Sequence, residues 1–311
     1  MIKNKKGFEM NFAWIFSIIA GVTILFLAIY ATSQFIKTRK YEIDTQTAAK
    51  LSILLDPLET SLESGKSSLI TFPSETRIYN DKCYTYGNFG EQSIGVAGSS
   101  GGSRWQEPAY SKPQYNKYIF SQNIEQGEEF RVFSKPFNMP FKVSDLVFFL
   151  GQEYCFVNVF EDIEDEIKGL GIKNVHFTDK KSNCSVESEI VCFSSSSGCD
   201  VAVYGDFESG YVSKEGKNLQ YSGPLVYGAI FSSSEVYECN VKRLMLRLVN
   251  LCLIQKDKIE VLESRGCGSL LDSHLNELIS LARQETPNLD AIKDKAEEIN
   301  MINDAAVCRL Y

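Results

Sequence analysis

The sequence predicts a mixed α+β fold in three parts: an N-terminal apolar helix with a stalk, a mixed sheet domain, and a C-terminal segment of three antiparallel helices. Three observations predict it. Residues 12–36 contain no charged side chain. Residues 67–231 alternate short runs of β-branched and aromatic residues with turn residues, which is typical of strands. Residues 232–311 carry apolar side chains at the 3.6-residue spacing of helices.

The first eleven residues form a short basic tail before an apolar run. A helix over residues 12–36 would be about 37 Å long at about 1.5 Å per residue, which exceeds the hydrocarbon core of about 30 Å. A signal peptide has a shorter apolar core, of about 7–15 residues, and a cleavage site of small residues after it. The run therefore predicts a transmembrane helix that is retained, with the lipid bilayer as its partner.

Residues 37–66 predict a juxtamembrane helical stalk. The chain from Glu42 to Leu55 has no Gly or Pro and can continue the spanning helix. Asp56, Pro57 and Glu59 have the order typical of a new helix start. Gly65 then ends the stalk.

The leader Lys5-Lys6-Gly7-Phe8 resembles that of archaeal type IV pilin-like proteins, in which a basic segment ends in Gly before an apolar helix. The resemblance implies cleavage between Gly7 and Phe8. In the bacterial pattern a Glu is the fifth residue of the mature chain, but here that position is Phe12 and the acid is Glu9. An uncut anchor preceded by lysines remains the alternative.

The nine cysteines all follow the apolar run, and none belongs to a CxxC pair. This pattern favours disulfides in an oxidising compartment over a zinc site. Cys267 and Cys308 are expected at the same end of the helical segment and therefore to pair. Cys192 and Cys199 are expected to bridge a hairpin between residues 190–193 and 200–204. The full set is Cys83, Cys155, Cys184, Cys192, Cys199, Cys239, Cys252, Cys267 and Cys308.

The disulfides decide the predicted orientation, because basic residues on the two sides of the apolar run nearly balance. We expect a single-pass protein of the cell membrane with a cytoplasmic N-terminus and an extracellular C-terminal domain. Asn183-Cys184-Ser185 is a glycosylation sequon, so Asn183 is a candidate for modification outside the cell.

Within residues 67–231 the pattern predicts a strand at 154–160, a helix at 161–170 and a strand at 174–178, which form a parallel unit. It also predicts a flexible loop at residues 95–103, a strand break at 135–137, and a last buried strand at Leu225–Phe231.

The helical segment begins with a capping box formed by Ser232 and Glu235, and its second and third helices are expected to begin at Ser269 and at Thr286-Pro287. Its residues resemble uncharacterised single-span membrane-anchored proteins of small-genome archaea. That resemblance implies an anchor and a mixed middle domain, and no activity. It is carried by Tyr237, Cys239, Asn240, Arg243 and Cys308.

One stretch matches an enzyme motif. Residues 98–102 fit GxSxG with Ser100 as nucleophile, His176 as base, and Asp145 or Asp162 to orient the base. The motif needs a helix after the serine, and residues 103–108 do not begin one. A Gly/Ser loop is the simpler interpretation.

The composition and motifs exclude several further classes of function. The acidic cluster at residues 161–166 lacks the ligand spacing of a calcium loop. With 32 basic and 40 acidic residues and a net charge of −8, the chain has no basic face for nucleic acid. We expect no catalytic residue, cofactor, metal or small-molecule ligand.

Together these observations favour a membrane-anchored cell-surface structural or interaction protein with a pilin-like layout, whose partners are the bilayer and other surface or membrane proteins. The alternatives are a membrane-anchored extracellular hydrolase and an accessory subunit of a membrane complex.

Overall fold

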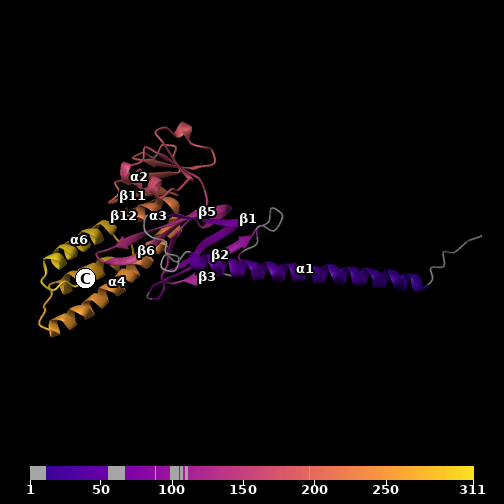
Figure 1. Cartoon of the computed structure of the whole chain (residues 1–311), viewed down its shortest axis with the longest axis horizontal. Helices are drawn as coiled ribbons and strands as arrows, with labels where there is room; N and C mark the ends of the chain where they lie inside the picture. The colour runs from indigo at the N-terminus through magenta and orange to yellow at the C-terminus, as the bar shows by residue number, and fades with distance from the viewer. Residues whose placement is uncertain are drawn as a thin grey trace, which may run out of the picture.

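The computed structural model describes residues 12–54, 67–87, 89–98, 105, 108, 111–195 and 197–311. Helix α1 (Phe12–Leu54) projects as one long rod from the folded part of the chain, residues 67–311, which we call the head (Figure 1). Within α1, Phe12–Phe35 is long and apolar enough to cross a membrane, and none of it is buried. At its other end α1 contacts β2 and β3 of the head. The leader residues Gly7 and Phe8 and residues 55–66 of the stalk lie outside the described residues.

The first sheet has six strands in the order β3-β2-β1-β5-β6-β4. Its neighbours are antiparallel except β4 and β6, which are parallel. The strands are β1 (Ser67–Tyr84), β2 (Glu91–Gly98), β3 (Ser111–Gln114), β4 (Tyr118–Phe120), β5 (Ile124–Asn138) and β6 (Lys142–Leu150).

Two expectations for this sheet are wrong. The loop expected at residues 95–103 is strand up to Gly98, because β2 pairs with both β1 and β3, and residues 99–103 lie outside the described residues. The break expected at residues 135–137 is absent, because β5 continues through Pro136. The pairing of β5 with β1 ends at Phe133, so at Pro136 β5 pairs with β6 alone, and prolines within sheets occur at such edge positions.

The second sheet has the order β12-β11-β10-β9-β7-β8. Strands β8, β7, β9 and β10 are parallel, and β10, β11 and β12 are antiparallel. Helix α2 (Glu161–Gly169) joins β7 to β8, so the predicted strand–helix–strand unit is confirmed. The strands are β7 (Tyr154–Val157), β8 (Val175–Thr178), β9 (Glu189–Phe193), β10 (Val201–Gly205), β11 (Ser209–Lys214) and β12 (Lys217–Ser222).

The expected hairpin between residues 190–193 and 200–204 is wrong, because β9 and β10 are parallel, with Val191 beside Val201. The connection between them therefore returns along the sheet before β10 begins. The Cys192–Cys199 disulfide closes this return, with 6.0 Å between the two Cα atoms.

The segment Leu225–Phe231 is helix α3 and not the expected strand. All seven of its residues are buried. A short run that is apolar throughout suits a buried strand and a buried helix equally, so periodicity cannot separate them. A Cβ on Gly228 would lie 2.6 Å from the ring of Phe120, which shows how closely α3 packs on the first sheet.

Three helices complete the chain: α4 (Ser234–Ser264), α5 (Leu271–Ala282) and α6 (Leu289–Ala305), with α5 contacting both α4 and α6. The expected caps are shifted. Ser233 caps α4 by accepting from the Val236 N–H, while the Ser232 hydroxyl donates to the Gly228 carbonyl. Helix α6 begins after Asn288, whose side chain accepts from the Ala291 N–H. One continuous apolar core joins both sheets to α2–α6.

Four disulfides connect the head. Cys83–Cys239 joins β1 to α4 across 156 residues, and Cys155–Cys184 joins β7 to the segment after the short 3-10 helix Lys181–Asn183. Cys267–Cys308 joins the α4–α5 turn to the segment after α6, with 6.2 Å between Cα atoms. Cys252 is a buried free thiol.

Candidate functional site

An open pocket of about 880 Å³ lies where connections from both sheets meet the start of α4. The first sheet supplies the β4–β5 connection, and the β6–β7 connection between the two sheets supplies Gln152. The second sheet supplies the ends of β9 and β10 and the β11–β12 turn. Five of the eleven lining residues are acidic: Glu187, Glu189, Asp200, Glu215 and Glu235.

A buried lysine lies beneath this acidic wall. Lys214, which is 4% exposed, donates to the carbonyls of Ile230 and Ser232 at 3.0 Å each. Its ammonium also lies 3.4 Å from Glu189 Oε1. Because the two carbonyls belong to α3 and to the residue after it, Lys214 ties the end of α3 to β9.

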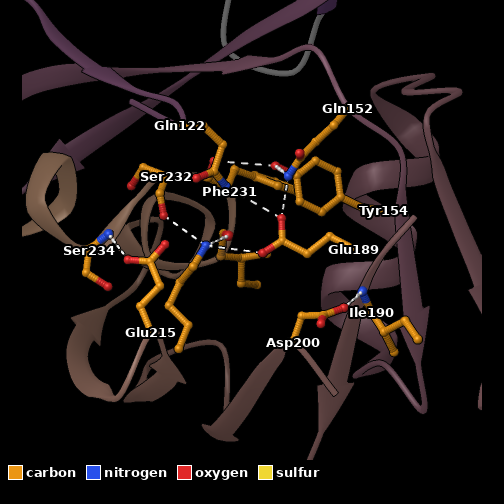
Figure 2. Close-up of polar contacts among 12 residues, drawn as sticks. Gln122, Gln152, Tyr154, Glu189, Ile190, Asp200, Glu215, Phe231, Ser232 and Ser234 are labelled. Carbon is orange, nitrogen blue, oxygen red and sulfur yellow. Dashed lines mark hydrogen bonds and ion pairs between the residues drawn. The ribbon is translucent and has the colours of Figure 1, made fainter. Parts of the chain in front are cut away.

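Glu189 is the most connected acid of the pocket. Its second oxygen accepts from the side-chain amides of Gln152 and Gln122. The Gln152 amide also donates to the hydroxyl of Tyr154, at 3.0 Å (Figure 2). Burial raises the pKa of Glu189, and the Lys214 ammonium opposes that rise. These bonds hold the carboxylate in one orientation.

On the other side of the network Glu215 supports the start of α4. Glu215 lies in the tight β11–β12 turn with a φ of 54°, and its carboxylate accepts from the Ser234 N–H at 2.9 Å (Figure 2). Burial raises the pKa of Glu215, but the hydrogen bonds from Ser234 outweigh it and leave this pKa below its ordinary value. An anion at a helix N-terminus is favoured by the helix dipole.

Behind the pocket, Glu125 is only 2% exposed. Its two oxygens accept from the backbone N–H groups of Gln122, at 3.2 Å, and Gly151, at 2.9 Å. Burial raises the pKa of Glu125 to about 8, although these two hydrogen bonds oppose the rise. The carboxyl group thus holds the β4–β5 connection and the β6–β7 connection together.

This arrangement suits binding of a cationic group, because five carboxylates line the pocket. Among the described residues, no histidine or cysteine lines the pocket. The hydroxyl of Ser233 donates to Asn123 Oδ1 at 2.7 Å and caps α4, so it is not activated as a nucleophile. In the described part of the chain no cluster of three or more His, Cys, Asp or Glu side chains is arranged to hold a metal ion.

The residues of the GxSxG hypothesis are not brought together where they are described. Ser100 lies outside the described residues, just after the end of β2. His176 on β8 lies 3.0 Å from Glu153, and Asp145 on β6 pairs with Lys142 at 2.8 Å. Asp162 lies in the first turn of α2.

Asn183, the glycosylation candidate, is the last residue of the short 3-10 helix and is exposed. Its amide donates to Thr178 Oγ1 at 3.2 Å. The next residue, Cys184, is bonded to Cys155.

A second polar centre explains several of the residues singled out in the tail. Arg243 is fully buried and donates to Asn240 Oδ1, to Gln92 Oε1, and to the backbone carbonyls of Gln114, Tyr115 and Lys117 at 2.8–3.2 Å. Asn240 also donates to the Ile119 carbonyl at 2.9 Å. These bonds connect α4 to β2, β3 and β4.

Sequence reasoning missed the acidic pocket because its carboxylates come from separate connections between residues 187 and 235 and form no motif. Comparison with known proteins adds no assignment: no family model, no curated protein and no solved structure matches this chain.

Proposed function

We propose that the chain is a membrane-anchored surface protein whose head has a structural or interaction role. The observation that carries the proposal is the exposure of the first half of α1. Phe12 is 79% exposed, Phe16 65% and Phe26 72%. Exposed apolar surface costs about 25 cal/mol per Å² in water, so a helix with apolar side chains on all faces requires another cover. A lipid bilayer supplies it over this length.

The disulfides support a head outside the cell. Four bonds in one head are typical of proteins in oxidising compartments and rare in the cytosol. Large domains are translocated largely regardless of flanking charge, so the basic residues after the span do not oppose this orientation. In that orientation exposed Asn183 is available for glycosylation.

The layout also supports a pilin-like role. A single helix of 43 residues carries an exposed apolar half, and its other end contacts the antiparallel strands β2 and β3. In such an arrangement, apolar helices associate in the membrane or in a filament while the heads face outward. We propose that the acidic pocket receives a cationic side chain of a neighbouring surface protein. An accessory subunit of a membrane complex would differ only in its partners.

The pilin-like proposal predicts that the leader is cleaved after Gly7. We expect the mature chain purified from membranes to begin at Phe8, and intact-protein mass spectrometry measures this directly. A Gly7→Val variant should keep its leader, because the peptidase pattern requires a small residue before the cut. Mature wild-type chains that retain Lys3, Lys5 and Lys6 would contradict the pilin-like role and leave a plain anchor.

A further inference from the structure

A second pocket, of about 670 Å³, lies at the β3–β4 connection, which precedes β4 in the chain. The acidic pocket, in contrast, includes the β4–β5 connection, which follows β4. The second pocket is formed by the β3–β4 connection, the first residues of β6, and Arg247 of α4. Glu235 of the acidic pocket and Arg247 are separated by twelve residues of α4, or about 18 Å at about 1.5 Å per residue. The two pockets are therefore distinct sites.

The wall of this second pocket is held by a buried cation without a carboxylate partner. Every hydrogen bond that Arg243 makes in the described part of the chain goes to a neutral amide or carbonyl oxygen. Buried charges in proteins are usually paired, so an unpaired guanidinium leaves its surroundings electropositive. Burial lowers the pKa of Arg243 to about 10, and it therefore stays protonated at neutral pH.

Arg247, one helical turn after Arg243, lines this pocket. Its Nε donates to the Val143 carbonyl at 2.6 Å and its Nη1 to Asn116 Oδ1 at 3.1 Å. Its guanidinium also lies beside the hydroxyl of Tyr118. The planar fork of an arginine matches two oxygens of a carboxylate, phosphate or sulfate.

Tyr118 is a further polar group beside the two arginines. The residue is fully buried, and its hydroxyl has no hydrogen-bond partner within the residues that the structure describes. Burial raises the pKa of Tyr118, while the nearby guanidiniums of Arg243 and Arg247 oppose that rise. The hydroxyl therefore lies close to the guanidinium of Arg247, which lines the pocket.

The lining charges are mostly positive. Arg247, Lys117 and Lys142 line the pocket, and its single acid, Asp145, already pairs with Lys142 at 2.8 Å. We propose that this pocket binds an oxyanion, a carboxylate or a phosphate or sulfate group on a small ligand, with Arg247 as the residue that contacts it. The site does not depend on the proposed anchoring or on the acidic pocket.

The test is calorimetric titration of the full chain in nonionic detergent at low ionic strength with three probes: citrate, inorganic phosphate and sulfate. We expect saturable binding of at least one probe and an affinity at least tenfold lower in Arg247→Gln. Arg283→Gln, which removes an exposed arginine at the end of α5, should bind as the wild type does. Binding of citrate alone identifies a carboxylate ligand, and binding of phosphate or sulfate alone identifies a tetrahedral oxyanion.

Lys142→Gln keeps the test informative if Arg247→Gln does not fold. The Lys142 side chain is exposed at the rim and its removal leaves α4 intact, so the affinity should fall about two- to threefold. Absence of saturable binding for all three probes, or equal affinity in the wild type and in folded Arg247 variants, would overturn the proposal.

Discussion

Replacing Arg243 with methionine lowers the free energy of unfolding of the head by about 3–5 kcal/mol. Methionine fills similar apolar space but donates no hydrogen bond. The carbonyls of Gln114, Tyr115 and Lys117 then lose the donor that holds the β3–β4 connection against α4. A buried polar group left without its partner costs about 1–3 kcal/mol. Removing an unpaired buried charge is itself favourable, so the expected loss of unfolding free energy is smaller than the summed cost of the three unpartnered carbonyls.

Urea unfolding of the full chain in detergent, followed by near-ultraviolet circular dichroism, measures this loss. The matched control is Arg283→Met, at an exposed arginine directly after α5, which should change the unfolding free energy by less than about 0.5 kcal/mol. Equal stabilities of the wild type and Arg243→Met would show that the buried arginine does not hold the two elements together.

The unfolding free energy of the wild type should fall as the pH rises from about 5 to about 8. The pKa of Glu125 is about 8 in the folded head against 4.5 for an ordinary glutamate, so the folded state binds this proton more tightly than the unfolded state. The stabilisation is complete below pH 4.5 and lost as the pH passes through 8. One pKa unit corresponds to about 1.4 kcal/mol, so the fall is on the order of 3–5 kcal/mol.

Glu125→Gln tests the assignment through the slope of stability against pH. The amide of glutamine would face one of the two backbone N–H donors, so the variant is less stable at low pH, but it should lose most of the pH dependence. Glu129→Gln, at an exposed position of the same strand, should keep the wild-type slope. A flat wild-type profile, or an unchanged slope in Glu125→Gln, would contradict the role of this buried carboxyl.

Local patterns predicted the elements whose side chains have one dominant period. The uncharged run from Phe12 and the Gly-free segment after it predicted one long helix, and α1 is continuous from Phe12 to Leu54. The acidic first turn and the apolar pair Ile163 and Ile167 predicted α2. The strand predicted at Leu225–Phe231 was wrong, because a segment buried on every side lacks the periodic pattern of apolar residues that distinguishes a helix from a strand.

The strand directions and the sites depended on contacts that are distant in sequence. The parallel pairing of β9 with β10 was missed because parallel strands usually need a connection of about a dozen or more residues, and the one between Phe193 and Val201 is shorter. Glu189 and Lys214 come together only when β9 lies beside the end of α3. The tail residues could be singled out in the sequence, but the role of Arg243 could not be predicted. It depends on hydrogen bonds to carbonyls more than 120 residues away.

We propose that α1 anchors a disulfide-bonded head outside the cell. The most direct measurement treats intact cells with a membrane-impermeant maleimide after mild reduction and maps the labelled cysteines by mass spectrometry. With the head outside, we expect labelling of Cys199, Cys267 and Cys308 in intact cells after reduction, and little labelling without it. Cysteines of the head that react only after lysis would place the head inside and contradict this orientation.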